Sequence, residues 1–352
     1  MSFAAIDLFC GIGGLTKGLL LSGIPVKAGI DIDASCRFAY EKNNNAKFIN
    51  CDITLLDGKQ LKSLYPNNTT RILVGCAPCQ PFSKYTTRYR KNGSIDDKWK
   101  LLYSFSRLVR EVKPEVISME NVPELGKEKV FSDFVSALEQ LNYFVDWKIV
   151  YCPQYGVPQN RKRLVLLASH LGEIELISPL YDADHYPTVR QAIGNLPSLN
   201  DGEQDANDLL HRACKLSATN LERIRQSVPG GTWRDWDDNL ILKCHKKESG
   251  KTYGSVYGRM SWDEPSPTIT TQFYGYGNGR FGHPEQDRAL SLREGAILQS
   301  FPPDYIFIDN EHPSNRREIG IHIGNAVPVE LGRIIGVSIQ QHLQGVEKDG
   351  KN

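Results

Sequence analysis

The chain has 352 residues, of which 40% are hydrophobic and 24% are charged, and its formal net charge is +1. This composition is typical of a folded globular protein, and the length favours two domains over one core. No apolar run reaches the roughly 18 residues that cross a bilayer, and the first residues lack the basic start of a signal peptide, so we expect a cytoplasmic protein without a membrane partner.

The first half of the chain alternates apolar strand patterns with helical patterns. This alternation predicts an α/β fold, with a doubly wound, mostly parallel sheet covered on both faces. Helical spacing of apolar residues follows the fourth strand up to Pro114 and recurs over residues 127–142. The predicted strands are residues 3–9, 26–32, 48–52, 71–76, 115–119, 144–151 and 163–168.

The alternation stops near residue 178, where Asp, Asn, Gly, Pro and Trp become more frequent. This change indicates a second, smaller domain. The last apolar segment, VPVELGRIIGVSIQQHL, is too long and too apolar to remain unpacked. We therefore predict a catalytic and cofactor-binding domain over residues 1–177, an inserted small domain over 178–322, and a segment over 323–352 that returns to the first domain.

A glycine-rich turn follows the first predicted strand, in AAIDLFCGIGGLTKGLL. Glycines 11, 13 and 14 permit close backbone approach and positive φ, and the start of the next helix offers N–H groups to a ligand. The dinucleotide pattern G-x-G-x-x-G is not met, because residue 16 is Thr. A tight turn without a ligand is the alternative interpretation.

Acidic residues lie at the ends of the next two predicted strands, with Asp52 closing the third, at the edge where doubly wound folds bind nucleotides. Asp31, in GIDID, can accept both ribose hydroxyls of a nucleoside, with Ile32 beside it to pack on an adenine ring. Asp52, in NCDI, can accept from an adenine amino group. For both carboxylates, a solvated strand-end aspartate is the alternative.

A cysteine suited to nucleophilic chemistry follows the fourth strand. Cys79 lies between Pro78 and Pro81 in GCAPCQPFS, and the prolines stiffen its loop. Redox chemistry with Cys76 is the alternative, but thioredoxin-type C-x-x-C pairs follow a chain's first βα turn. The other cysteines are too dispersed for a structural zinc site, so we predict no metal.

Three further polar residues lie near the ends of the later strands. Glu120 closes the fifth strand in SMENVPE, where it can share a proton with a ring nitrogen. Arg161 and Arg163 begin the last strand, and their i, i+2 spacing puts both on one face, ready for a phosphate or a carbonyl oxygen. A solvated carboxylate and a solvated ion pair are the alternatives.

The motifs DLFCGIGG, GIDID, GCAPCQPFS, MENV, QNRKR, LSLREGAILQSFP and IGNAVP stand in this order over almost the whole chain, apart from residues 180–255. They resemble the DNA cytosine-5 methyltransferase family of the bacterial or phage type. The resemblance implies the S-adenosylmethionine-dependent methyltransferase fold. It also implies methyl transfer from S-adenosyl-L-methionine to carbon 5 of a flipped-out cytosine in a specific double-stranded DNA sequence, with S-adenosyl-L-homocysteine as the product.

The resemblance also implies roles for individual residues. Cys79 attacks carbon 6 of the base, and Glu120 contacts ring nitrogen 3 and the amino group. Arg163 holds the base carbonyl, with Arg161 supporting the site. This chain has DDKWKLL where the family often shows an Arg-Gly pair, so contacts between Cys79 and Leu101 stay open. The implied cofactor-binding residues are Phe9, Gly11, Ile12, Gly14, Asp31, Ile32, Asp52, Ile53, Pro78, Leu101, Asn325 and Val327.

Two segments are candidates for DNA contact. The basic and aromatic segment 83–100 predicts a loop that closes over DNA, and a solvated loop is the alternative. Segment 257–284 mixes aromatic residues, glycines and arginines, so we predict that residues 180–287 form a target-recognition domain. Arginine can pair with guanine or brace the domain itself, and both readings stay open. The predicted DNA contacts are Ser83, Arg88, Arg90, Arg259, Thr270, which matches the family's threonine signature, and Arg280.

The expected partner is double-stranded DNA, bound by a monomer. A cognate restriction endonuclease would act on the same site without a stable complex. Two other functions stay open, a tRNA cytosine-5 methyltransferase and a catalytically silent nucleic-acid-binding relative. Cys79, Glu120 and Arg163 together argue against silence, because a binding module needs none of them. Thr16 disfavours a nicotinamide oxidoreductase.

Overall fold

The structure is a computed structural model that describes residues 2–78, 95–309 and 315–349. The chain forms two compact units, the first with residues 1–155, 162–180 and 327–352, and the second with residues 156–161 and 181–326. Three boundaries differ from the prediction. The first unit extends to residue 180 rather than 177, the chain returns to it at residue 327 rather than 323, and residues 156–161 belong to the second unit. Residues 156–161 join the second unit because β7 (Gln159–Asn160) pairs there with β9 (Ser266–Pro267).

A seven-stranded, mostly parallel sheet forms the centre of the first unit, which confirms the predicted fold class. The strand order is β3-β2-β1-β4-β5-β8-β6. Only β8 runs antiparallel to its neighbours, because no crossover helix separates it from β6. The strands are β1 (Phe3–Leu8), β2 (Val26–Asp31), β3 (Lys47–Asn50), β4 (Thr70–Gly75), β5 (Val116–Asn121), β6 (Phe144–Tyr151) and β8 (Lys162–Ser169).

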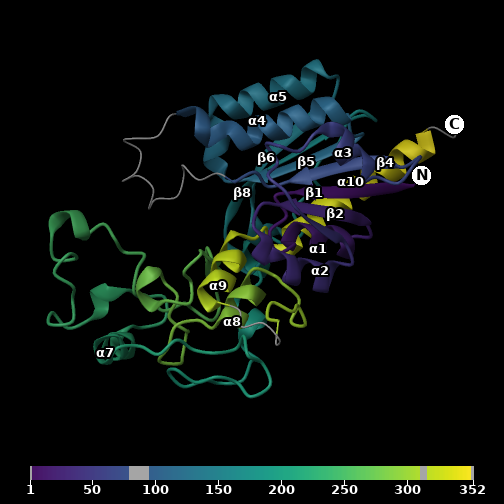
Figure 1. Cartoon of the computed structure of the whole chain (residues 1–352). Helices are drawn as coiled ribbons and strands as arrows, with labels where there is room; N and C mark the ends of the chain where they lie inside the picture. The colour runs from purple at the N-terminus through teal and green to yellow at the C-terminus, as the bar shows by residue number, and fades with distance from the viewer. Residues whose placement is uncertain (1, 79–94, 310–314, 350–352) are drawn as a thin grey trace. The chain divides into compact units, whose positions relative to one another are not determined.

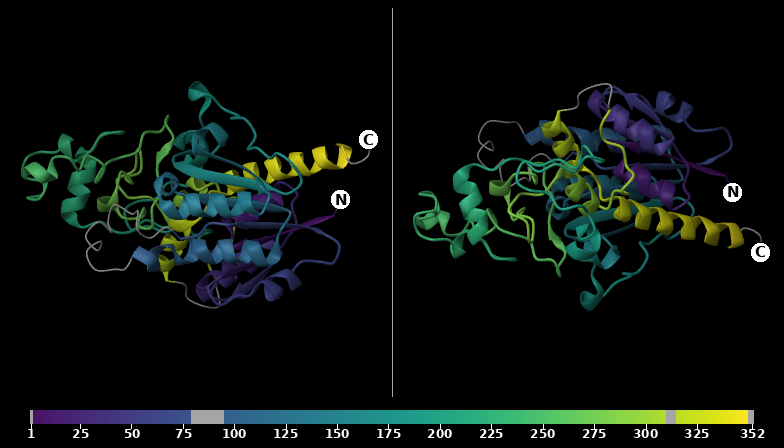
Figure 2. Two further views of the ribbon diagram at one scale, coloured as in Figure 1. Left: turned by 90° about the horizontal axis from the view of Figure 1, so that it is seen from above. Right: turned by 90° about the horizontal axis from the view of Figure 1, so that it is seen from below.

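Helices cover both faces of this sheet, as Figures 1 and 2 show. One face carries α1 (Gly14–Leu21), α2 (Arg37–Asn44) and α10 (Val329–Asp349), and the other carries α3 (Gly58–Ser63), α4 (Ile95–Val112) and α5 (Lys129–Gln140). The aromatic rings of Phe105 and Phe134 meet between α4 and α5, with centroids 5.5 Å apart, and both side chains are fully buried. The core therefore lies between the sheet and its helices, and the loops at the strand ends are left for ligands.

Helices α1 and α10 approach each other closely because glycines lie at their crossing. A Cβ atom on Gly18 would lie 2.4 Å from the backbone nitrogen of Arg333 and 2.4 Å from the carbonyl oxygen of Val329. Any side chain at this position would force the two helices apart. The C-terminal helix is thus fixed to the helix that follows the glycine-rich loop.

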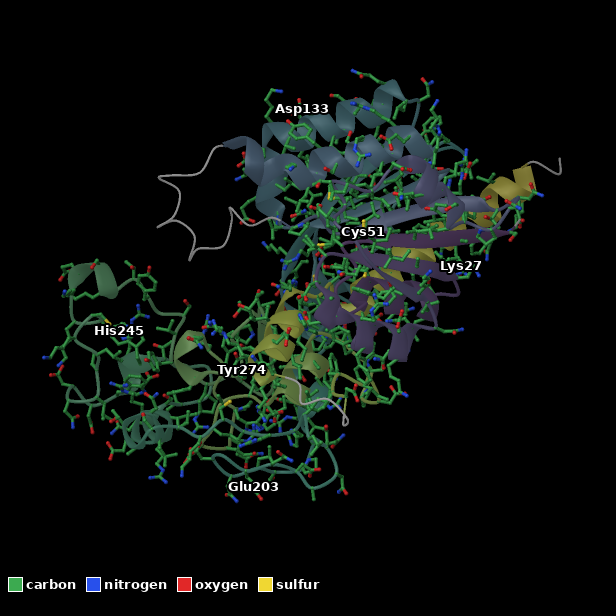
Figure 3. The ribbon with its side chains drawn as sticks, viewed as in Figure 1. Lys27, Cys51, Asp133, Glu203, His245 and Tyr274 are labelled. Carbon is green, nitrogen blue, oxygen red and sulfur yellow. The ribbon has the colours of Figure 1, made fainter. Side chains whose placement is uncertain are left out.

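The second unit contains short elements joined by long irregular segments. Its core includes Trp233, Trp236 and Tyr276, and the ring of His245, labelled in Figure 3, stacks on Trp233 with centroids 4.5 Å apart. Buried polar groups supplement this small core, because Ser227 Oγ bonds both to Trp236 Nε1 at 2.8 Å and to the Tyr276 hydroxyl at 2.6 Å. Its helices are α6 (Val189–Ile193), α7 (Ala218–Gln226), α8 (Leu292–Leu298) and α9 (Arg316–Asn325).

Among the helices that the structure describes, none combines the length and the apolar character needed to cross a membrane.

Candidate active site

The strand order reverses between β1 and β4, and this point defines the site. Strands β2 and β3 lie on one side of β1, and β5 lies beyond β4, so the loops after β1 and β4 diverge from adjacent strand ends. Leu8 is paired with Gly75 at that edge. In open α/β sheets, ligands bind at the carboxyl ends of strands where the order reverses.

The loop after β1 has the backbone conformation that its glycines predict. Gly11 and Gly13 have φ values of 50° and 88°, and Phe9, between strand and loop, also has a positive φ of 60°. An added Cβ at Gly11 would have no atom within 4 Å, so the substitution is disfavoured by the backbone and not by crowding. Gly14 begins α1, and Ile12 is buried.

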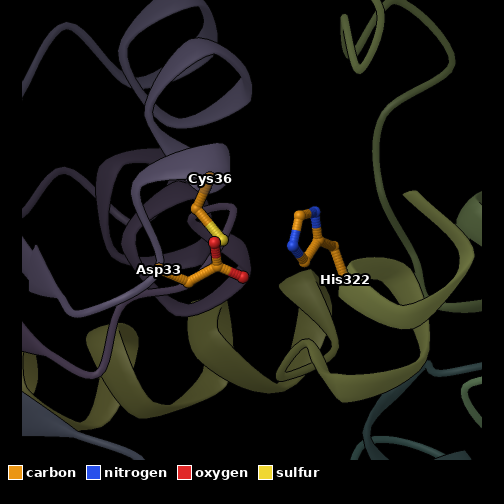
Figure 4. A group of neighbouring side chains, drawn as sticks. All are labelled: Asp33, Cys36 and His322. Atoms are coloured by element: carbon orange, nitrogen blue, oxygen red, sulfur yellow. The ribbon is translucent and has the colours of Figure 1, made fainter. Parts of the chain in front are cut away.

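Asp31 fastens the glycine loop to the end of β2. Its Oδ2 accepts the backbone N–H of Gly11 at 2.8 Å, and its Oδ1 accepts that of Asp33 at 2.9 Å. The next residue, Ile32, is 68% exposed. Asp33 accepts the backbone N–H of Ser35 at 3.0 Å and so caps the turn that contains buried Cys36 (Figure 4). A carboxylate beside an exposed apolar side chain is thus present where a nucleoside was predicted.

The prediction that Asp52 closes the third strand is wrong, because β3 ends at Asn50. Instead its Oδ1 accepts the backbone N–H of Thr54 at 2.8 Å, and this hydrogen bond is the main cause of a lowered pKa for the Asp52 carboxyl. Ile53 beside it is buried in the core. The Asp52 carboxylate therefore shapes its own turn, and its contact with an adenine stays a prediction.

The other predicted cofactor residues come from several parts of the chain. Pro78 is exposed at the end of the described part of the loop after β4, and Leu101 is half-buried in α4. Asn325 is the exposed last residue of α9 in the second unit, whereas Val327 is buried in the first. Their role in binding a cofactor stays a prediction.

Glu120 lies near the end of β5 and is 2% exposed. Arg163 Nε, on the neighbouring antiparallel strand β8, is 2.9 Å from Glu120 Oε1. The thiol of Cys76, directly after β4, donates to Glu120 Oε2 at 2.9 Å. Three strands thus deliver a carboxylate, a guanidinium and a thiol to one place. Cys79 lies outside the described residues.

The prediction that Arg161 and Arg163 share one face of a strand is wrong. Strand β8 begins at Lys162, and Arg161 belongs to the second unit. The buried Arg161 donates through Nη1 to Gln159 Oε1 and to the carbonyl oxygen of Ile269, both at 3.3 Å. It thus braces the segment beside Thr270, whereas Arg163 pairs with Glu120.

A buried acid in β1 was missed by the sequence analysis. Asp7 is 1% exposed, and burial raises its pKa to about 7. Thr16 Oγ1 donates to Asp7 Oδ2 at 2.7 Å and lies 3.1 Å from the Tyr40 hydroxyl. The threonine that breaks the dinucleotide pattern is therefore a polar anchor between β1 and α1. The sequence offered one signal for this contact, because Asp7 and Thr16 are only nine positions apart, on either side of the glycine-rich turn.

The structure contradicts the predicted contact of Arg259 with DNA, because this arginine is 5% exposed and all three of its guanidinium nitrogens have partners inside the second unit. Its Nε donates to the carbonyl oxygens of Ile224 and Ser227, and its Nη1 donates to those of His283 and Gln286. Its Nη2 pairs with Asp287. Arg259 therefore braces the domain, as the alternative reading held.

Arg280 and Thr270 are exposed, in contrast to Arg259, so both stay predicted DNA contacts. The stem of Arg280 lies over Gly258, where an added Cβ would be 2.5 Å from Arg280 Cγ. The backbone of Thr270 rests on Gly324, where an added Cβ would be 2.5 Å from the Thr270 carbonyl oxygen. The remaining predicted contacts, Ser83, Arg88 and Arg90, lie outside the described residues.

Comparisons with known proteins identify the family of this chain. A family model described as C-5 cytosine-specific DNA methylase matches residues 3–341. A relative from Herpetosiphon aurantiacus, named Type II methylase M.HgiDII, is 55% identical over 98% of this chain and 97% of its own length. Type II methyltransferase M1.HphI from Haemophilus parahaemolyticus is 30% identical over 96% of this chain and 87% of its own length.

Solved structures show the same fold. The methyltransferase EhMeth of Entamoeba histolytica is similar with a TM-score of 0.65 and 18% identity, over 97% of this chain and 99% of that one. The Dnmt2 methyltransferase of S. pombe is similar with a TM-score of 0.60 and 17% identity, over the same shares of the two chains. The predicted enzyme class is confirmed by the family match and by the first relative, and the chain belongs to the C-5 cytosine-specific DNA methylase family.

Proposed function

We propose that this DNA cytosine-5 methyltransferase uses S-adenosyl-L-methionine to methylate a cytosine within a specific double-stranded sequence, through a covalent adduct at Cys79. The observation that carries the proposal is the buried carboxylate of Glu120 on β5, which pairs with Arg163 on β8; β5 neighbours β4, one of the two strands between which the order reverses. The carboxylate lies against Cys76, three residues before Cys79 in the motif GCAPCQPFS. A carboxyl group that can donate a proton, a guanidinium that can bind the carbonyl oxygen of the ring, and a nearby nucleophilic cysteine together suit an attack on a heteroaromatic ring.

The residues after β1 and β2 fit S-adenosyl-L-methionine. The carboxylate of Asp31 can accept from the ribose hydroxyls, and the exposed side chain of Ile32 offers an apolar surface to the adenine ring. Gly11 has open space where a side chain would project, so a ligand can approach the backbone. When bound, this cofactor supplies a methyl group on a positively charged sulfur, which makes the carbon electrophilic.

The chain's own residues activate the cytosine. The Cys79 thiolate forms a bond to carbon 6, and ring nitrogen 3 takes a proton from Glu120, so the ring becomes an enamine that is nucleophilic at carbon 5. Arg163 holds the base carbonyl oxygen. Once carbon 5 carries the methyl group, ring nitrogen 3 returns its proton to Glu120 and a base removes the proton from carbon 5. The bond between carbon 6 and Cys79 then breaks, the thiolate leaves, and aromaticity returns. The net change in the ring is a methyl group in place of the proton at carbon 5.

The base must leave the duplex before this attack, at a cost of a few kcal/mol. We assign segment 83–100 to closure over the DNA, and residues 180–287 to recognition of the target sequence. The relatives named above are called Type II methylase and Type II methyltransferase. We therefore propose that this chain modifies the site of a cognate restriction endonuclease. That the chain works as a monomer is a separate part of the proposal.

Duplex DNA that contains 5-fluorocytosine tests the proposal directly. Fluorine at carbon 5 cannot leave as a proton does, so the wild-type chain should remain covalently attached to such DNA in the presence of S-adenosyl-L-methionine. Cys79→Ala should abolish both trapping and methyl transfer while binding the cofactor normally. Tritiated methyl transfer to duplex DNA and to tRNA should label only the DNA. Methylation by the alanine variant at an appreciable rate, or labelling of tRNA alone, would refute the proposal.

A further inference from the structure

Cys76 belongs to the C-x-x-C pair, yet the proposed mechanism gives it no task. Its thiol donates to Glu120 Oε2 at 2.9 Å, while Arg163 Nε lies 2.9 Å from Glu120 Oε1. One oxygen of this buried carboxylate thus accepts the thiol hydrogen, whereas the other lies in an ion pair with Arg163 and has no hydrogen-bond partner among the described residues. We propose that Cys76 is a positioning residue, which fixes the carboxylate of Glu120 for the cytosine ring; this inference rests on the proposed function.

The backbone around Cys76 is fastened on both sides, so the direction of its thiol is set by the fold. The N–H of Cys76 donates to the carbonyl oxygen of Leu8 in β1 at 3.4 Å. The side-chain amide of Asn121, the residue after Glu120, donates to the carbonyl oxygen of Ala77 at 2.9 Å. The loop after β4 is thus tied to β1 and β5, and the Cys76 side chain faces the carboxylate.

The chemistry of a thiol suits this task. Sulfur is a weak hydrogen-bond donor, whereas a guanidinium is a strong and permanently charged one. Cys76 therefore adds no charge beside the pair of Glu120 and Arg163. Its weak bond can be replaced at little cost when the amino group of cytosine donates to Glu120 Oε2. The Cys76 thiol can thus orient the Glu120 carboxylate before the cytosine binds, and can then be replaced by the cytosine, which favours the reacting geometry.

The experiment removes the donor and then restores it. Cys76→Ala should lower kcat about three- to tenfold, the range of one hydrogen bond, with KM for duplex DNA changed less than twofold. Cys76→Ser keeps a hydroxyl donor and should lie within twofold of the wild-type kcat. Cys76→Val, which fills the space without donating, should resemble Cys76→Ala. Cys244→Ala, at an exposed cysteine of the second unit, controls for general loss of thiols.

A second measurement tests whether Cys76 acts through Glu120. In the Glu120→Gln background, measured by single-turnover transfer of tritiated methyl groups, Cys76→Ala should slow transfer less than twofold further. Calorimetry with S-adenosyl-L-methionine should give the wild-type affinity for every Cys76 variant, which shows that each is folded. The result for wild-type protein on 5-fluorocytosine DNA separates this inference from the proposed function.

Three results would overturn the positioning role while wild-type trapping stands. They are a kcat of Cys76→Ala within twofold of wild type, a Cys76→Ser variant as slow as Cys76→Ala, and an undiminished effect of Cys76→Ala in the Glu120→Gln background. If the wild-type chain itself neither traps the DNA nor methylates it, the proposed function fails and the positioning role fails with it.

Discussion

Replacing Asp7 with Asn should remove a large part of the pH dependence of the protein's stability. The carboxyl of Asp7 is 1% exposed, and burial is the largest cause of its raised pKa of about 7. The hydrogen bond from Thr16 opposes this shift, and the charge of Asp31 adds to it. Among the described residues, no group donates a hydrogen bond to Asp7 Oδ1. The ionised form is therefore poorly stabilised in the folded chain.

The sign of the effect follows from proton linkage. The pKa is 3.8 in the reference state and about 7 in the folded chain, so between these values the folded state keeps a proton that the unfolded state has lost. Stability from Asp7 is thus fully present below pH 3.8 and is lost as the pH rises through about 7. A shift of about three units corresponds to about 4 kcal/mol. An asparagine side chain does not titrate in this range, so the free energy of unfolding of Asp7→Asn should not show this decline.

Urea unfolding of wild type and Asp7→Asn at several pH values between 5 and 8 measures the difference. Other titrating groups contribute equally to both proteins, so the free energy of unfolding of the variant should rise relative to wild type by about 3 kcal/mol over this range. Thr16→Val, which removes a donor to the ionised carboxylate, should extend the decline to higher pH. A difference between Asp7→Asn and wild type that stays constant within 1 kcal/mol would refute the reasoning.

Three further predictions concern binding and the second unit. Arg259→Met should lower the free energy of unfolding in a urea titration by about 3–5 kcal/mol, because it leaves buried carbonyl groups without a donor. Arg280 is exposed, so Arg280→Met should change this free energy by less than about 0.5 kcal/mol. Asp31→Ala should weaken S-adenosyl-L-methionine binding at least about tenfold, and an unchanged affinity in calorimetry would contradict its role. Exchange of residues 181–287 for those of a relative with another target should change the methylated sequence, and a chimera that methylates the original sites would exclude this segment from recognition.

The central strands of the large sheet could be predicted because they are short apolar runs. Parallel strands are buried on both faces, so Ala4, Ala5 and Ile6 of β1 are all apolar and fully buried. The ends were less accurate, as β3 shows. Its predicted end at Asp52 lies two residues beyond the observed one, since the Asp52 side chain forms a turn with Thr54 instead of continuing the strand.

The fate of single arginines could not be predicted in the same way. Arg259 and Arg280 stand in one aromatic and glycine-rich segment, yet the first is buried and the second exposed. The carbonyl groups that bind Arg259 come from residues up to 35 positions away in the chain. Arg161 and Arg163 differ for a related reason, because the chain passes from one compact unit to the other between them. Local spacing contains no information about such distant partners.

Two residues that the sequence analysis used only to weigh against a function have polar contacts of their own in the structure. Thr16 counted only against a dinucleotide site, yet its hydroxyl holds the buried acid of β1. Cys76 counted only as half of a redox pair, yet its thiol reaches the carboxylate of Glu120, on the next strand of the sheet. In both cases the partner lies across adjacent elements of a doubly wound fold, where side chains from consecutive strand ends converge. A residue that departs from a familiar motif at such an edge is therefore a candidate for a supporting role at the site, and its nearest carboxylate is the first partner to test.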